Sequence, residues 1–81
     1  MKYPVYAFRD VKTQFGQPYI EQNEDAAVRG FGLMMNNPDS VMKFSPGDFD
    51  LYHIGYFDTD SGLIEGLQVP EFIVNGKSVI V

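Results

Sequence analysis

The alternation of apolar and polar residues predicts strands near both ends of the chain, with one helix between them. The first strand would cover residues 3–10 and has apolar side chains on both faces, with Tyr3, Val5 and Ala7 on one and Tyr6 and Phe8 on the other. Strands that are apolar on both faces are covered on both sides. This strand is therefore expected at the centre of its sheet, followed by a loop over residues 11–22 that Gly16 and Pro18 punctuate.

Residues 23–37, NEDAAVRGFGLMMNN, have the spacing of a helix. Asn23 is a favourable N-cap, and the acidic residues that follow it suit the positive end of the helix dipole. The side chains expected to face a sheet recur every three or four residues: Ala27, Phe31, Met34 and Met35.

Residues 51–57 and 63–67 read as two strands joined by a short turn, DTDSG. In the first of them, Tyr52, Ile54 and Tyr56 would share one face. The pair Asp58 and Asp60 before a glycine also suggests a calcium loop, but the spacing of further ligands and the flanking helices of an EF-hand are missing. Asp and Ser are common turn residues, so the stretch is interpreted as the tip of a β-hairpin.

The tail, PEFIVNGKSVIV, suggests a second hairpin. Asn75-Gly76 is the strongest short signal for a two-residue type I′ turn, which would pair residues 72–74 with residues 77–81. An apolar strand at the very end of the chain needs a cover. We therefore expect a homodimer with this C-terminal strand at or near the interface.

Together these elements predict an α+β fold over a single domain, residues 1–81. One helix would pack on a small, mainly antiparallel sheet of about four to five strands. Apolar residues make up 44% of the chain, with seven Phe and five Tyr, which is enough for a core. There is no cysteine, and neither a membrane span nor a signal peptide is recognisable, so we expect a soluble cytoplasmic protein that does not bind membranes.

The net charge of −5 lies entirely in the second half, because the acidic and basic residues of positions 1–45 balance. A protein that binds nucleic acid non-specifically is usually basic, since neutralising phosphates supplies most of the affinity. The composition therefore argues against avid DNA binding and leaves room for a local basic face in the first half.

Catalytic and metal-binding patterns are nearly absent. The single histidine, His53, lies within a strand, no serine stands in a nucleophile elbow, and no glycine-rich loop precedes a helix. The paired aspartates lack a third ligand at a telling spacing. We expect neither an enzyme nor a bound metal or cofactor.

Four stretches, in this order, are similar to the small non-structural protein of gokushovirus-type microviruses, tailless phages with single-stranded DNA genomes. They are VYAFRDVKTQFGQP, NEDAAVRGF, DFDLYHIGYFDTDSGLI and VPEFIV. The resemblance implies a non-structural accessory protein of genome replication, thought to favour production of single-stranded DNA. It also implies a location in the cytoplasm of the infected bacterium rather than in the virion, and contact with DNA or with replication proteins.

Three hypotheses follow. The first is weak binding of single-stranded DNA, with phosphate contacts from basic residues of the first half and base stacking on its aromatic rings. The residues expected to bind nucleic acid are Arg9, Lys12, Arg29, Phe15 and Tyr19, with Tyr3 as a further ring. The second is an acidic adaptor that binds a basic phage or host replication protein. The third, an enzyme of unrecognised type, is the least favoured.

Overall fold

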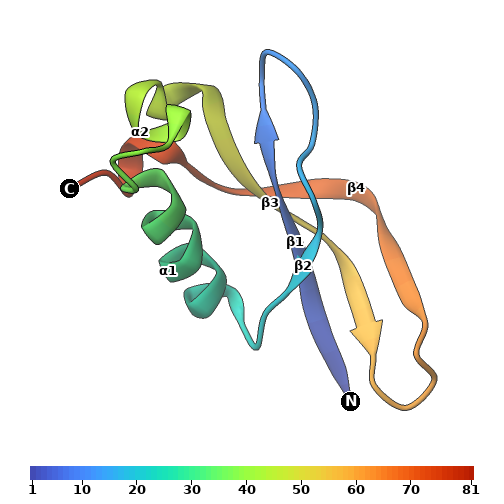
Figure 1. Cartoon of the computed structure of the whole chain (residues 1–81). Coiled ribbons are helices and arrows are strands. Elements are labelled where there is room, and N and C mark those ends of the chain that lie inside the picture. Colours follow the sequence, from blue (N-terminus) through green and yellow to red (C-terminus); the bar gives the residue numbers. More distant parts are fainter.

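The computed structural model describes residues 1–81 and shows a four-stranded antiparallel sheet with its helices on one side (Figure 1). The strands lie in the order β2-β1-β3-β4. The elements in chain order are β1 (Lys2–Asp10), β2 (Tyr19–Ile20), α1 (Glu24–Met35), α2 (Val41–Phe44), β3 (Phe49–Asp58) and β4 (Ile64–Asn75), with 3-10 turns at Pro46–Asp48 and Gly76–Ser78. The expected α+β fold with one main helix on a small antiparallel sheet is confirmed, and β1 is central as predicted.

The helix α1 has an asparagine at each end, and the N-cap is Asn23, as the sequence predicts. The Asn23 side chain accepts a hydrogen bond from the backbone N–H of Ala26 at 2.9 Å. At the other end, the Asn36 side chain donates to the carbonyl oxygens of Gly32 and Val79, both at 2.8 Å. A single asparagine thus satisfies a carbonyl at the end of α1 and ties the helix to the C-terminal segment.

The core lies between α1 and one face of the sheet, which we call the helix face. Ala27, Phe31 and Met35 are fully buried on the helix, and Tyr6 and Leu51 are buried on the strands below them. Burying a large apolar side chain contributes about 1.5–3 kcal/mol. This packing, more than the propensity of a helix that contains two glycines, stabilises α1 on the sheet.

The outer strand β4 departs from a regular ladder with β3. His53 pairs with Glu71 and Gly55 pairs with Gly66, so residues 67–70 lie opposite Ile54 alone. The register of β3 against β1 also shifts at this point. The regular alternation expected for residues 51–57 is therefore wrong beyond Ile54, and Tyr56 packs edge-on against His53 at 4.8 Å between ring centroids.

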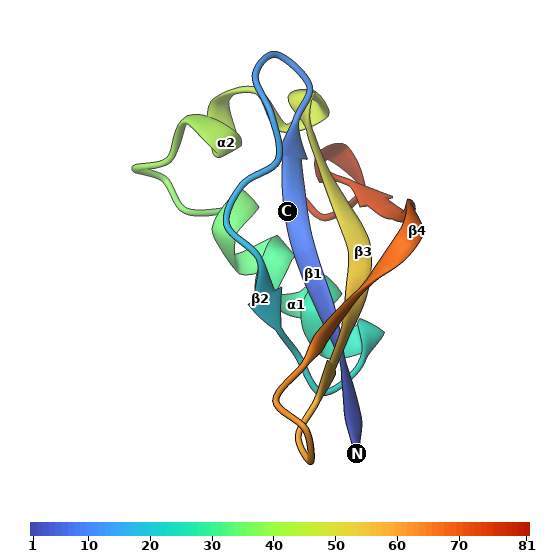
Figure 2. The same ribbon diagram turned by 90° about the vertical axis from the view of Figure 1, so that its right-hand side faces the viewer.

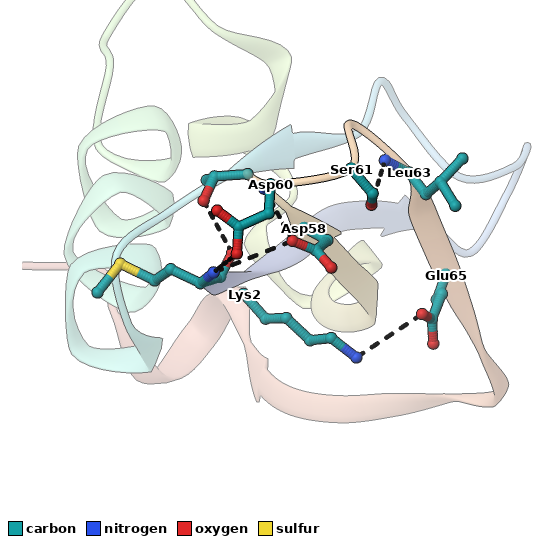
Figure 3. Close-up of polar contacts among 8 residues, drawn as sticks. Lys2, Asp58, Asp60, Ser61, Leu63 and Glu65 are labelled. Carbon is teal, nitrogen blue, oxygen red and sulfur yellow. Dashed lines mark hydrogen bonds and ion pairs between the residues drawn. The ribbon is translucent and has the colours of Figure 1, made fainter.

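The β3–β4 turn is a hairpin tip, as predicted (Figure 3). The Asp58 carboxylate accepts a hydrogen bond from the N–H of Asp60 at 2.9 Å, and the Ser61 hydroxyl accepts one from Leu63 at 3.2 Å. Gly62 has a φ of 76°, a conformation that favours glycine. Asp58 and Ser61 thus bond the backbone of their own turn, as such residues do in tight turns.

The expected C-terminal hairpin is wrong. A type I′ turn needs positive φ at both central residues, but Asn75 has a φ of −90° and Gly76 begins a 3-10 turn. A Cβ on Gly76 would overlap the Pro46 carbonyl and the Met35 side chain, so glycine is required here by close packing and not by turn geometry. The chain after Gly76 turns back toward α1 instead of forming a strand.

Near the end of the chain, Val79 and Ile80 pack against the core instead of forming an edge strand. The N–H of Val81 donates to the Asn36 side chain at 3.0 Å. The C-terminal strand that motivated the dimer is therefore absent, and dimerisation stays a prediction without that reason. None of the helices has the length and apolar character required to cross a bilayer.

Candidate nucleic-acid interface

The face of the sheet opposite the helices, which we call the open face, carries no covering element (Figure 2). Val5 and Ala7 of β1 point to it and are only 2% and 1% exposed. Side chains on the neighbouring strands shield them, because directly paired residues share a face of a sheet. Ala7 pairs with Tyr52 of β3, and Val5 pairs with Ile20 of β2.

Three aromatic rings form a row across this face, which we call the aromatic ridge: Phe15, Tyr52 and Phe72. The centroids of Phe15 and Tyr52 are 5.3 Å apart and those of Tyr52 and Phe72 are 6.0 Å apart, both edge to face. Phe15 and Phe72 are nevertheless 41% and 54% exposed. The three rings of the ridge thus pack against one another, and the two outer rings still expose a large aromatic surface to solvent.

Phe15 reaches the ridge because the chain turns back on itself after β1. The N–H of Asp10 donates to the Gln14 carbonyl at 3.0 Å, and that of Gly16 donates to the Phe8 carbonyl at 2.8 Å. Phe15 consequently forms a bridge to Arg9 at the edge of the sheet. The loop expected over residues 11–22 is in fact an ordered return that ends in the short strand β2.

Arg9 lies beside the ridge and its positive charge has no carboxylate partner. Its guanidinium carbon is 5.9 Å from the centroid of the Phe15 ring, within the range of a cation–π contact. The carboxylates that form ion pairs in the structure all bind Met1 or Lys2. Asp50, paired directly with Arg9 across β1 and β3, instead accepts a hydrogen bond from the Asn75 side chain at 2.7 Å.

Lys12 projects from the exposed turn that follows β1, three residues from Arg9. Its backbone N–H donates to the Asp10 carboxylate at 2.9 Å, and its ammonium group forms no ion pair. Arg9 and Phe15 thus lie together at one end of the open face, and Lys12 lies in the turn at that end. The nearby carboxylates of Asp10 and Asp50 both hold hydrogen-bond donors but still offset part of the positive charge.

The other residues expected to bind nucleic acid lie elsewhere. Tyr19 pairs with Tyr6 on the helix face, where its hydroxyl is buried with no hydrogen-bond partner. Burial, with the Glu21 carboxylate as a smaller cause, raises the pKa of Tyr19 to about 12. Arg29 is exposed on α1, on the covered side of the sheet, and Tyr3 lies near the far end of β1.

Tyr52 and Phe72 are the members of the ridge that the sequence did not single out. Tyr52 was placed on one face of a strand without a role, and Phe72 was assigned to a C-terminal hairpin that does not form. The signal available in the sequence is the presence of aromatic residues in both stretches. Which of their rings meet is decided by the pairing of strands that are distant in the sequence.

The acidic residues of the hairpin tip lie at the end of the molecule opposite to the loop after β1, and the molecule is 40 Å long (Figure 1). Lys2 is 3.7 Å from Glu65, and the amino group of Met1 is 3.0 Å from Asp60. The N–H of Asp60 is the main cause that lowers the pKa of Asp58. The carboxylates of the tip are thus partly neutralised by Lys2 and by the amino group of Met1.

No group of three or more His, Cys, Asp and Glu side chains is close enough to hold a metal ion. His53 is 8% exposed, and its Nε2 is 2.9 Å from the carbonyl oxygen of Gly55. Its ring lies between those of Tyr6 and Tyr56, at 5.2 and 4.8 Å. The one histidine is therefore packed and hydrogen-bonded within the fold.

The geometry defines a small α+β protein with a covered face and an open, aromatic face. A family model described as phage ORF5 protein matches residues 3–79, and the chain belongs to this family of phage proteins. No curated protein matches the chain, and no solved structure does.

Proposed function

We propose that this phage protein is a non-enzymatic accessory factor of genome replication that binds single-stranded DNA weakly through its open face. The observation that carries the proposal is the unpaired Arg9 guanidinium over Phe15, at one end of an exposed aromatic ridge. Proteins that bind single strands without sequence preference combine cations for the backbone with aromatic rings for the bases. Arg9 and Lys12 would contact phosphates, and Phe15 would stack on an unpaired base.

The charge balance explains why such binding would be weak. The chain carries a net charge of −5, and Asp10 and Asp50 lie close to the basic residues. Few phosphates can be neutralised, so both the affinity and its dependence on salt should be modest. A weak, reversible contact suits a factor that associates with DNA transiently or together with a replication protein.

Membership of a phage family supports the part of the proposal that makes this a phage protein. The resemblance of residues 7–10, 23–31 and 50–62 to the non-structural protein of gokushovirus-type microviruses supplies the finer role. In that role the protein favours single-stranded genomes during replication, in the cytoplasm of the infected bacterium, and is not part of the virion.

Fluorescence anisotropy with an unstructured oligonucleotide at two salt concentrations tests the proposal. Wild type should bind at low salt, and each lost phosphate contact should reduce the salt slope by about 0.7. The double substitution Arg9→Ala and Lys12→Ala should therefore weaken binding and flatten the slope by up to about twice that amount.

The chain offers a matched control, Arg29→Ala with Lys43→Ala. It also removes one arginine and one lysine, here from exposed positions on the helices α1 and α2. It should bind nearly as wild type does. Equal losses in the two double variants would show a general charge effect, and no binding by wild type at low salt would contradict the proposal.

A second candidate function rests on the hairpin tip. Leu63 and Ile64 are 64% and 65% exposed there, beside the carboxylates of Asp58, Asp60 and Glu65. Exposed apolar residues with acidic neighbours suit a basic protein partner. If DNA binding fails, an adaptor that contacts a replication protein through this tip becomes the leading function, and Asp60→Lys with Glu65→Lys should then abolish that contact.

A further inference from the structure

The aromatic ridge has two exposed ends and a shielded middle. Tyr52 is half-buried between its neighbours, and its contacts with Phe15 and Phe72 have interplanar angles of 71° and 81°. The two outer rings therefore both stand roughly perpendicular to the ring between them. Each outer ring directs an edge or a face toward Tyr52 and keeps further surface free for another flat group.

The small side chain of Ala7 is what brings these rings together. Phe15 and Tyr52 lie on opposite sides of β1, yet their centroids are only 5.3 Å apart, so the rings lean toward each other over that strand. Ala7, directly paired with Tyr52, is 1% exposed as a result. A longer side chain at this position would occupy the space that lets the ridge continue across the sheet.

Phe72 ends the ridge on β4, the strand at the free edge of the sheet. It is 54% exposed, although it pairs with Tyr52 in the ladder between β3 and β4. An aromatic ring that served only to complete a core would be expected to be more fully buried. Its exposed surface lies at the far side of the ridge from Arg9.

We infer that Phe72 is a second base-stacking position, so that the ligand of the open face is an unstacked single strand that crosses the sheet from Phe15 to Phe72. The inference rests on the proposed function and extends it to Tyr52 and Phe72. Tyr52 separates the two stacking positions and prevents one continuous stack of bases from lying along the ridge. A duplex, whose bases are stacked and paired, offers no free base face to either ring.

The path across the strands is also the one that the charges favour. A strand of nucleic acid that ran lengthwise along β3 would reach the carboxylates of Asp58, Asp60 and Glu65 at the hairpin tip. A crossing path begins beside Arg9 and Lys12 and leaves the molecule at the edge strand. The phosphates thereby stay near Arg9 and Lys12, neither of which forms an ion pair.

An experiment with two oligonucleotides tests this inference. One is an oligothymidine of about eight nucleotides, a length within the range of small single-strand sites. The other has the same length and the same phosphates but only abasic residues. Phe72→Leu keeps an apolar side chain beside Tyr52 and removes the flat ring, so it should weaken binding of the oligothymidine about fivefold or more, the lower end of the range for one stacked base. Binding of the abasic strand should not change.

The control variant is Phe44→Leu, which removes an 89% exposed phenylalanine on α2, away from the ridge. It should bind both oligonucleotides as wild type does. Circular dichroism and unfolding curves establish that each variant is folded before binding is compared.

The possible outcomes separate the inference from the function on which it rests. If Phe72→Leu binds oligothymidine as wild type does, or weakens both oligonucleotides equally, the second stacking position is wrong while DNA binding stands. If wild type binds both oligonucleotides equally, the rings do not stack on bases and only the phosphate contacts remain. If wild type binds neither, the proposed function itself fails.

Discussion

The two faces of the sheet use phenylalanine in opposite ways. On the helix face, Phe31 is fully buried in one apolar cluster with Met35 and Leu51. On the open face, Phe15 and Phe72 contact Tyr52 but remain about half exposed. The comparison shows that apolar content alone does not distinguish a side chain that stabilises the fold from one available to a ligand.

The charged groups around the ridge on the open face form no ion pair. Arg9 on the open face has no carboxylate partner, whereas the acidic groups around it hold backbone or amide donors. A surface that only needed to be soluble would gain a little from an ion pair between Arg9 and Asp50, which are directly paired. Its absence leaves a cation free beside an aromatic platform.

The test with the largest expected effect on the free energy of unfolding is to truncate one phenylalanine on each face. Phe31→Ala should lower the free energy of unfolding by about 3–5 kcal/mol, because the lost ring leaves a cavity under α1. Phe72→Ala should lower it by about 1 kcal/mol or less, since half of that ring is exposed and one edge contact is lost. Urea unfolding of the two variants measures the difference. Similar losses would mean that the ridge is a second core.

A smaller change concerns the hydroxyl of Tyr19, which is buried on the helix face without a partner. Tyr19→Phe should raise the free energy of unfolding by about 1 kcal/mol, because an unsatisfied polar group is removed and the ring is kept. It should leave DNA binding unchanged, since the ring is not on the open face. A loss of stability would reveal a bonding partner for the hydroxyl.

The same residue gives a pH dependence with a defined sign. Its pKa is about 12 in the folded protein and 10.0 for an ordinary tyrosine, so the folded state retains the proton more strongly. Wild type should therefore lose stability as the pH rises above about 10 and continue to lose it up to about 12. Tyr19→Phe should lack this part of the alkaline loss, which unfolding curves at several alkaline pH values would measure.

The smallest expected effect is at the hairpin tip, which belongs to neither face. The pKa of Asp58 is lowered, mainly by the hydrogen bond from the N–H of Asp60, so its contribution to stability is present above about pH 4 and is lost as the pH falls further. Asp58→Asn should show a slightly weaker decrease in melting temperature between neutral and acid pH than wild type. Asp39→Asn, on an exposed loop, is the matched control for loss of one negative charge, and an equal change there would contradict a local effect.

The sequence was sufficient for those elements whose signals are local. The N-cap at Asn23, the apolar positions of α1 and the turn at residues 58–62 depend on neighbours within a few positions, and each is confirmed. The central place of β1 followed from its two apolar faces. These features require only helical or strand periodicity and turn chemistry.

Other features depended on distant parts of the chain. Asn75-Gly76 has the composition of a tight turn, but Gly76 is needed because Pro46 and Met35 approach it, which no local pattern reveals. The same limit applies to the candidate site. Arg9 and Phe15 are close in sequence and were expected together, whereas Tyr52 and Phe72 join them only through the pairing of β3 with its neighbours.

The edges of the sheet have a consequence for how the protein behaves at high concentration. The edge strand β2 has two residues. In β4, the pairing with β3 is interrupted at residues 67–70, among them Pro70, which has no N–H to donate. Long, regular edge strands are templates for strand addition between molecules, and irregular or proline-containing edges hinder it. Although Leu63, Ile64, Val69 and Phe72 expose apolar surface along this edge, it cannot offer a continuous ladder to another chain. The sheet can thus leave one face uncovered without being a ready nucleus for fibrils.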